Sequence, residues 1–397
     1  MERRVAITGC GALTAAGADL DRLWSDLASA RTHIGPLERF SCPGMKGLLG
    51  CEVRLPPEQP GGEAERAARM ASIAARSALA DSALPAGARE RTGVVLGSTL
   101  CEERQVSELD DAWAARGAAS VDGGFLERID GHRLAARVAR EHELGGPVLL
   151  TATACSSGNA AIAWAYDLVA AGAAEAMVAG GVDTLTRLVY SGFSRMGALS
   201  KSRCRPFDRR RDGVSFGEGA GVVVLEELGH ARRRGARIYA EIAGYGLSND
   251  AHHLTAPEPN GEGFARAMRQ ALASTGTAPA EVDYVSAHGT GTVQNDLAET
   301  RAMKAVFGER AWQVPLSSIK SVIGHTNGAA SAIETIVCAL ALQRQAVPPT
   351  AGLTEPDPEC DLDYVPGQGR AARVGRCLNL SAGFGGSNVC LLLAEAR

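Results

Sequence analysis

The sequence lacks three features that would point to metal binding, nucleic-acid binding or a membrane span. Its ten cysteines contain no C-x-x-C pair and no regular ligand spacing, so we expect neither a zinc site nor a disulfide framework. A formal net charge of −4 gives no sign of the excess of basic residues that is typical of nucleic-acid-binding proteins. The longest apolar segments, residues 160–182 and 328–342, are interrupted by Asp167, Glu175 and Glu334, which predicts buried helices rather than membrane spans.

The composition is that of a large globular protein. The chain has 397 residues, of which 45% are hydrophobic and 22% charged, so it can bury a sizeable core and is expected to form two or more structural units. The apolar stretch within residues 1–10 is too short for the hydrophobic region of an export signal. We therefore expect a cytoplasmic protein whose cysteines stay reduced.

One cysteine stands where a strand is expected to give way to a helix. Residues 147–153 favour a strand, and an Ala-rich helix follows Cys155. Unpaired N–H groups and the positive end of the helix dipole stabilise an anion there, so we expect a lowered pKa for the Cys155 thiol and thiolate near neutral pH. Cys155 is a candidate nucleophile, and the alternative is an inert cysteine that fills the core.

Two histidines lie on glycine-rich loops in the second half of the chain. His288 follows the apolar strand 282–285. His325 precedes the apolar helix 331–342, and Lys320 lies just before it. In open α/β sheets, catalytic groups gather at the carboxyl ends of strands and at the adjoining helix starts. The pattern predicts that these side chains share one site with the candidate nucleophile, while a hydrogen-bonded structural histidine is the alternative for either histidine alone.

With these motifs the chain resembles the β-ketoacyl-acyl-carrier-protein synthases of type I/II. These are condensing enzymes of the thiolase superfamily whose active site holds one cysteine and two histidines. The resemblance covers nearly the whole chain, and the motifs together are far more specific than any one glycine-rich motif. The matching segments are 5–11, 153–158, 179–183, 205–208, 211–213, 217–221, 288–292 and 383–388, together with Lys320, Gly324 and His325.

The resemblance implies a two-step reaction. Cys155 would take an acyl group from a carrier-protein thioester, and the backbone N–H groups of Cys155 and Phe384 would form the oxyanion hole. A malonyl thioester would then lose carbon dioxide. N–H donors of His288 and His325 would stabilise the enolate oxygen, and the enolate carbon would attack the acyl-enzyme. The product is a 3-oxoacyl chain two carbons longer, and the reaction calls for no cofactor and no metal.

Two further residues are implied to support the histidines. Lys320 matches a lysine that fixes the charge state and orientation of the histidine pair in the family, and its alternative is a solvated loop lysine. Glu334, nine residues after His325, matches a carboxylate that helps to order the loops of the site. A glutamate in an apolar helix needs a partner in any case.

The residue at position 384 separates the branches of the superfamily. Degradative thiolases need a second cysteine near the C-terminus, where this chain has Phe384. Starter-unit enzymes pair cysteine with histidine and asparagine, whereas this chain has a second histidine motif. The nearest late cysteine, Cys390, lies in an apolar strand pattern and is predicted to belong to the core.

The fold that the resemblance implies is thiolase-like α/β, with two related βαβ-rich halves in a layered α-β-α-β-α core. A weak internal repeat agrees, because the same order of strand, turn and helix occurs around Cys155 and again around His325. A basic helix ends at Gly235 and a new strand is expected to follow. We therefore divide the chain into residues 1–236, which carry the cysteine, and residues 237–397, which carry both histidines.

The resemblance also implies partners and leaves two assemblies open. Acyl- and malonyl-loaded acyl carrier proteins would be the partners in the reaction. The arginines at 232–234 are either a solvated helix end or a contact for such an acidic partner. The chain would form a homodimer, or a heterodimer with a chain-length-factor-like subunit. Silent subunits lack the nucleophile, so the intact Cys155 favours an active enzyme; a non-elongating subunit that shapes a partner's pocket is the alternative.

Several positions depart from the common pattern and bear on the acyl chain. Ala382 stands where many fatty-acid synthases have an aromatic residue, and Asn327 replaces a small or aliphatic one. Cys101 and Glu102 follow a turn in a region that often lines the acyl pocket. These departures favour a specialised synthase for a polyketide, polyene or modified fatty acid. The alternative is the housekeeping fatty-acid enzyme with neutral changes at permissive sites.

Overall fold

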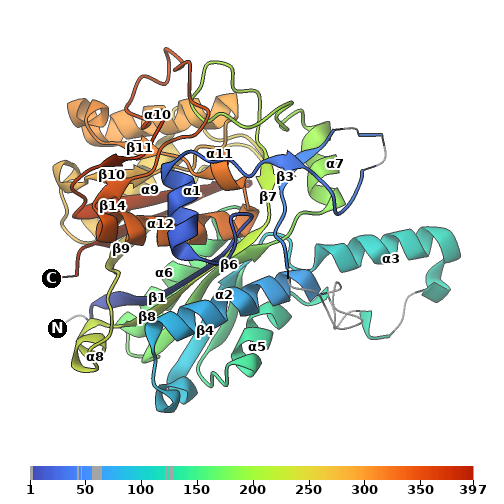
Figure 1. The fold of residues 1–397 in the computed structure, drawn as a ribbon, viewed down its shortest axis with the longest axis horizontal. Helices are drawn as coiled ribbons and strands as arrows, with labels where there is room; N and C mark the ends of the chain where they lie inside the picture. The colour runs from blue at the N-terminus through green and yellow to red at the C-terminus, as the bar shows by residue number, and fades with distance from the viewer. Residues whose placement is uncertain are drawn as a thin grey trace.

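The computed structural model describes residues 3–42, 44–45, 47–55, 65–120, 123–125 and 129–396. Ten strands of this part form one sheet (Figure 1). In spatial order they are β11 (Leu316–Ser317), β10 (Tyr284–Ser286), β14 (Arg376–Gly383), β15 (Ser387–Ala394), β9 (Ala240–Asn249), β1 (Val5–Leu13), β8 (Gly219–Glu227), β6 (Ala176–Asp183), β4 (Thr92–Gly97) and β5 (Val148–Thr151).

The sheet consists of two halves with the same strand order. β1 and β9 meet at its centre as antiparallel neighbours. Outward from β1 the order is β8, β6, β4 and β5; outward from β9 it is β15, β14, β10 and β11. In each half the first two pairings are antiparallel and the last two are parallel. This repetition confirms the predicted α/β fold with two related halves.

Helices form three layers around the two groups of strands. In the middle, α6 (Ser157–Ala170) packs on α12 (Ala330–Arg344), and α12 contacts strands of both halves. On the outside, α2 (Arg66–Ser82) and α5 (His132–Glu141) cover the first half. α9 (Glu262–Ala273) covers the second half and packs against α10 (Val293–Phe307). The predicted α-β-α-β-α layering is therefore present (Figure 1).

The remaining elements are short or lie at the margins of these layers. The additional helices are α1 (Leu20–Ala28), α3 (Glu103–Arg116), α7 (Arg187–Arg195), α8 (Leu228–Arg233) and α11 (Lys320–Ile323). Short 3-10 turns are η2 (Ala86–Arg91), η3 (Ala118–Ser120), η4 (Pro279–Glu281), η5 (Gly308–Trp312) and η6 (Asn327–Ala329). Two small sheets hold β2 (Gly35–Pro36), β3 (Leu49–Cys51) and β7 (Phe216–Gly217), and β12 (Ala346–Val347) with β13 (Arg370–Ala371).

The central helices pack so closely that one contact point has room only for glycine. A Cβ added at Gly158 of α6 would lie 2.8 Å from the Cβ of Ala332 in α12 and 2.8 Å from the carbonyl oxygen of Gly328. Both central helices are largely apolar, and α12 is buried from Ala330 to Leu342, whereas α6 leaves one side exposed at Trp164 and Asp167. This contact fixes the distance between the halves of the core.

We expect Gly158→Ala to lower the free energy of unfolding by about 1–3 kcal/mol, since a methyl group would overpack the contact. Urea denaturation measures the effect. Gly192→Ala in α7 is the matched control, because no atom lies within 4 Å of a Cβ placed there. Equal stability of the two variants would contradict the close packing of α6 on α12.

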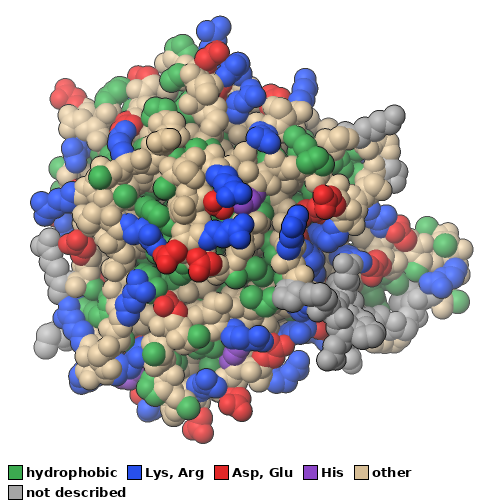
Figure 2. All heavy atoms as spheres, in the orientation of Figure 1, with side chains coloured by type: hydrophobic (Ala, Val, Ile, Leu, Met, Phe, Trp, Pro, Cys, Tyr) green, Lys and Arg blue, Asp and Glu red, His purple; other side chains and the backbone are tan. Residues whose placement is uncertain are grey.

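Charges of both signs are interspersed over the face of the molecule shown in Figure 2. The arginine run at the end of α8 is only partly solvated: Arg232 and Arg233 are exposed, whereas Arg234 pairs with the buried Glu226 at 2.5 Å. The prediction of a fully solvated helix end was therefore wrong for Arg234, because Glu226 on β8 needs a cation. Among the helices of the described part, none combines the length and apolar character needed to cross a membrane.

Candidate active site

Cys155 lies in the turn between β5 and α6, one residue before the helix N-cap Ser156. Ala154 has a φ of 53°, a left-handed conformation that costs a residue with a Cβ roughly 1–2 kcal/mol. Ser157 ties the turn together, because its hydroxyl donates to the carbonyl oxygen of Ala154 (2.5 Å) and accepts from the N–H of Thr153 (2.9 Å). The turn places Cys155 on a cavity of about 190 Å³, at the helix N-terminus that the sequence predicts.

The electrostatic environment of the thiol differs from the sequence-based expectation. Burial raises the pKa of Cys155 to about 12, although the charge of Lys320 acts in the opposite direction. The prediction of a lowered pKa was wrong because the pattern reveals a helix start but not the depth of burial, and Cys155 is only 9% exposed. A thiol with this pKa is protonated at neutral pH, so any reaction through its sulfur would have to remove that proton.

His288 follows β10 on a loop that a buried carboxylate holds in place. Glu299 of α10 accepts the backbone N–H groups of His288 (2.7 Å) and Gly289 (2.8 Å). Gly289 has a φ of 37°, and a Cβ there would lie 2.5 Å from the Cβ of Ser318. Since the backbone is fixed on both sides, the imidazole of His288 has a defined position beside the cavity.

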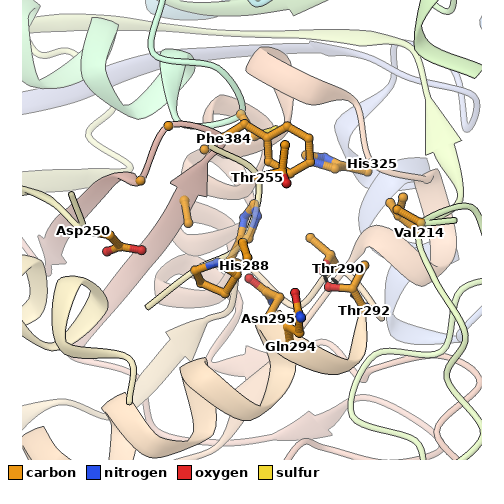
Figure 3. A pocket seen from close by; sticks show the side chains of 18 of the residues that line it. Val214, Asp250, Thr255, His288, Thr290, Thr292, Gln294, Asn295, His325 and Phe384 are labelled. Atoms are coloured by element: carbon orange, nitrogen blue, oxygen red, sulfur yellow. Dashed lines mark hydrogen bonds between the residues drawn. The ribbon is translucent and has the colours of Figure 1, made fainter. Parts of the chain in front are cut away.

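His325 lies between α11 and η6 and bridges to β7. Its N–H donates to the carbonyl oxygen of Ser215 (2.8 Å), and its own carbonyl accepts from Gly217 (3.0 Å). Its imidazole stacks on Phe216, with ring centroids 5.8 Å apart. The rings of His288 and His325 meet edge to face at 5.6 Å, and Figure 3 shows both around the same cavity. The two predicted histidines and the cysteine therefore line one cavity.

Both histidines are neutral at physiological pH. Burial, followed by the charge of Lys320, holds the pKa of His288 and the pKa of His325 well below the usual 6.5. A neutral imidazole carries one N–H donor and one lone pair. The pair can therefore donate hydrogen bonds to a negative charge that develops in the cavity, without giving up a proton.

Lys320 and Glu334 form an ion pair behind the histidines. The Nζ atom of Lys320 lies 2.5 Å from Oε1 of Glu334, and each side chain is 1% exposed. Burial raises the pKa of Glu334 to about 7, and Lys320 opposes this rise. Lys320 is therefore not a solvated loop lysine, and it is the partner that the sequence predicts Glu334 to need. Neither side chain is among the described residues that line the cavity, and the charge of Lys320 reaches the site by lowering the pKa of both histidines.

We expect Lys320→Met to lower the free energy of unfolding by about 3–5 kcal/mol, because Glu334 would be left buried without its cation. Urea denaturation at pH 8 measures this loss. Without Lys320 the buried carboxyl of Glu334 loses the charge that lowers its pKa, so in the folded variant it must take up a proton or stay ionised without a partner, whereas it is ionised in the unfolded chain. The double variant Lys320→Met/Glu334→Leu, which removes both charges, should recover most of the loss. A loss below about 1 kcal/mol for the single variant, the range of exposed pairs, would contradict a buried pair.

Phe384 lies on the glycine-rich loop between β14 and β15, next to the cysteine turn. A Cβ at Gly383 would lie 2.6 Å from the carbonyl oxygen of Thr153 and 3.2 Å from the backbone nitrogen of Cys155, so only glycine permits this approach. The ring of Phe384 is 39% exposed and stacks on Phe193 at 5.1 Å. The loop therefore meets the backbone of the candidate nucleophile, where the sequence predicts an oxyanion hole.

Sequence reasoning missed the carboxylates that hold these loops. Glu299 supports the loop of His288, and no pattern separates it from the other acidic residues of α10. Asp183 was noted only as part of the motif 179–183. Other polar side chains of the cavity wall are Asp250, Thr255, Thr290, Thr292, Gln294, Asn295 and Asn388; Thr290 and Thr292 belong to the segment 288–292 that the resemblance uses.

Of the positions that depart from the family pattern, one lines the cavity and the others do not. Ala382 is part of its wall, but Cys101, Glu102 and Asn327 are absent from the described residues that line it. Asn327 is 3% exposed and has a φ of 49°, a conformation that asparagine adopts more readily than most residues. Cys390 is fully buried in β15, as predicted for a core residue.

Two family models match the chain. The model described as the N-terminal domain of beta-ketoacyl synthase matches residues 56–231, and the one described as its C-terminal domain matches residues 239–354. The chain belongs to the β-ketoacyl synthase family. Members of this family are condensing enzymes of the acyltransferase type, so the resemblance inferred from the motifs is confirmed.

Curated relatives of this β-ketoacyl synthase match over nearly their full length. It is 41% identical to nodulation protein E of Rhizobium meliloti (strain 1021), with 100% of both chains covered. It is 38% identical to 3-oxoacyl-[acyl-carrier-protein] synthase 2 of Synechocystis sp., covering 98% of this chain and 97% of the relative. It is also 38% identical to the tetracenomycin polyketide synthase ketoacyl synthase alpha subunit of Streptomyces glaucescens, covering 100% and 98%.

A solved structure shares the fold of this synthase in detail. The ishigamide ketosynthase/chain length factor aligns with a TM-score of 0.95 and 36% sequence identity, with 100% of both chains covered. The fold prediction is therefore confirmed by comparison as well as by topology.

Proposed function

We propose that this protein is a 3-oxoacyl-[acyl-carrier-protein] synthase that extends a carrier-bound acyl chain by two carbons. The observation that carries the proposal is the convergence of Cys155, His288 and His325 on one cavity beside the loop of Phe384. These groups supply a nucleophile, two neutral N–H donors and backbone donors, as a decarboxylative condensation requires.

In the first step, the sulfur of Cys155 attacks the carbonyl carbon of an acyl-carrier-protein thioester. The bond from the acyl carbon to the carrier sulfur breaks, and the carrier thiol leaves with the proton that Cys155 gives up. The N–H groups of Cys155 and Phe384 stabilise the oxyanion, since the close approach at Gly383 brings their backbones together. The product is an acyl thioester on Cys155.

In the second step, a malonyl-carrier-protein thioester loses its free carboxylate as carbon dioxide. The electron pair of the broken carbon–carbon bond moves into an enolate, whose oxygen accepts hydrogen bonds from His288 and His325. The enolate carbon attacks the acyl thioester, the new carbon–carbon bond forms, and the sulfur of Cys155 leaves and takes up a proton. The product is a 3-oxoacyl chain on the carrier, and no step calls for a cofactor or a metal.

Lys320 and Glu334 act as positioning residues in this scheme. Burial is the main cause of the lowered pKa of both histidines, and the charge of Lys320 adds to it, so Lys320 helps to keep them neutral. Glu334 in turn holds Lys320 at 2.5 Å.

We assign the cysteine to one half of the chain, residues 1–236, and the two histidines to the other, residues 237–397. We place the enzyme in the cytoplasm.

Acyl carrier protein and a second condensing-enzyme subunit are the partners of this synthase. The names of its relatives include a 3-oxoacyl-[acyl-carrier-protein] synthase, and a structural neighbour is a ketosynthase/chain length factor. The chain therefore acts as a homodimer or with a chain-length-factor-like subunit. A role only as the pocket-shaping subunit of another enzyme is the second candidate, and the intact set of cysteine and histidines argues against it.

Intact-mass analysis of the purified protein with a panel of acyl carrier proteins tests the proposal. Wild type should gain the mass of the acyl group and, when malonyl carrier protein is added, release a 3-oxoacyl product two carbons longer. Cys390→Ala is the control, since this cysteine is buried in β15 away from the cavity and its loss should leave acylation intact. Acylation of Cys155 only in the presence of a partner subunit would select the heterodimer, whereas acylation of the partner subunit and never of Cys155 would favour the second candidate.

The acyl panel also separates the two substrate classes. A specialised synthase should extend polyunsaturated or aromatic-primed acyl carriers more efficiently than saturated medium-chain ones, because Ala382 leaves space in the cavity wall beside Phe384. A housekeeping fatty-acid enzyme would extend saturated chains at least as well.

A further inference from the structure

Asp183, the last residue of β6, is a buried carboxylate with no obvious charge partner. It is 0% exposed, and in the described part of the chain no Lys, Arg or His side chain pairs with it. It accepts hydrogen bonds from the hydroxyl of Ser98 (2.7 Å) and from the N–H groups of Thr99 (2.9 Å), Leu100 (2.9 Å) and Gly328 (2.6 Å). Burying an ionised carboxylate without a cation costs free energy. Hydrogen bonds from four donors on two loops offset this cost.

One of these loops carries a histidine of the active site. Gly328 lies in η6, three residues after His325, and a Cβ added to it would lie 2.8 Å from Oδ2 of Asp183. On its other side, the backbone of His325 is bonded to Ser215 and Gly217. The segment that holds the imidazole is thus anchored at one end by β7 and at the other by Asp183.

The other loop supports the apolar wall of the cavity. Residues Ser98 to Leu100 join β4 to α3, and Leu100 packs on a cluster that contains Val214, Phe216 and Phe193. Val214 and Phe193 line the cavity of the nucleophile, and Phe216 stacks on the ring of His325. An acyl chain bound along this wall would press on the same cluster that the loop supports.

We propose that Asp183 is a positioning residue that joins the apolar wall of the cavity to the loop of His325 and so sets the geometry of the decarboxylation step. This inference rests on the proposed function. Acyl transfer uses the sulfur of Cys155 and the donors of the Phe384 loop, to neither of which Asp183 is hydrogen-bonded. The charge of Asp183 only adds to burial in raising the pKa of the Cys155 thiol, so its removal should not slow attack by the sulfur. Decarboxylation uses the imidazole whose loop Asp183 anchors, so the two steps should respond differently to its loss.

The variant Asp183→Asn tests this difference, because its amide group presents N–H donors where the carboxylate accepts them. We expect acylation of Cys155, followed by intact mass, to stay within about threefold of wild type, while carbon dioxide release from malonyl carrier protein falls on the order of 10–100-fold, the scale of an ångström-sized misplacement. Glu226→Gln is the matched control. Glu226 is an equally buried carboxylate that bonds Thr8 and pairs with His230 and Arg234, and none of these residues lines the cavity. Its replacement controls for the general cost of altering a buried carboxylate and should slow neither step selectively.

Equal slowing of both steps in Asp183→Asn, in proportion to a loss of thermal stability, would reduce Asp183 to a structural residue and overturn the proposal. If that variant is too unstable to purify, Ser98→Ala removes one donor and should show the same imbalance at smaller size; equal slowing there would also overturn it. A wild-type protein that performs neither step would instead contradict the proposed function itself, so the two failures are distinguishable.

Discussion

Replacing Cys155 with alanine is expected to abolish formation of the 3-oxoacyl product, with a fall in kcat on the order of 10⁴-fold or more, the scale seen when a catalytic nucleophile is removed. Without the sulfur the acyl-enzyme should not form, since the described residues that line the cavity include no second cysteine. Decarboxylation of malonyl carrier protein should persist, because His288, His325 and their supporting loops are independent of the thiol. Product formation and carbon dioxide release, measured in parallel, check both parts.

The control for this variant is Cys390→Ala, which removes a buried cysteine in β15 without touching the cavity. It should retain acylation and product formation. An alanine variant at position 155 that still gains an acyl group would show that another nucleophile carries the acyl chain, and the assignment of Cys155 would be wrong.

His325→Ala is expected to separate the two half-reactions in the opposite way. Acylation of Cys155 should continue, whereas decarboxylation should fall by about 10²–10³-fold, as when one preorganised donor to an oxyanion is removed. The reason is that the imidazole is neutral and held at the cavity by Phe216 and the bridge to β7. The intact mass of samples quenched at set times measures the first step, and carbon dioxide release measures the second.

His132→Ala serves as the control for the histidine variant, since His132 is exposed on α5 and does not line the cavity. Neither step should change in it. If His325→Ala instead lost acylation while decarboxylation continued, the imidazole would belong to the first step and the scheme would need its roles exchanged.

The parts of the molecule that were predictable are those carried by short contiguous patterns. The segment around Cys155 combines an apolar strand, a small-residue turn and an Ala-rich helix, and the structure has β5, the turn and α6 in that order. The motif 288–292 and the segment around His325 likewise lie within one stretch each, so the position of His288 after a strand and of His325 before a helix followed from local sequence. Their roles in catalysis remain predictions that the variants test.

The parts that were not predictable depend on residues distant in the chain. Asp183 meets Gly328 across 145 positions, and nothing near either residue indicates the contact. The pKa of Cys155 was predicted in the wrong direction for a related reason: the helix start is local, but the burial that raises the pKa to about 12 comes from segments throughout the chain. Arg234 is a different case, because its partner Glu226 is only eight residues away in the chain. The strand pattern around Glu226 does not show that its carboxylate is buried and pairs with an arginine.

The most direct test of the account is a stoichiometry measured on acylated wild-type enzyme with malonyl carrier protein labelled with ¹³C at its free carboxylate. The account predicts one labelled carbon dioxide and one unlabelled 3-oxoacyl product for each acyl group lost from Cys155. Carbon dioxide released without chain extension, or a product that keeps the label, would contradict a decarboxylative condensation at this site.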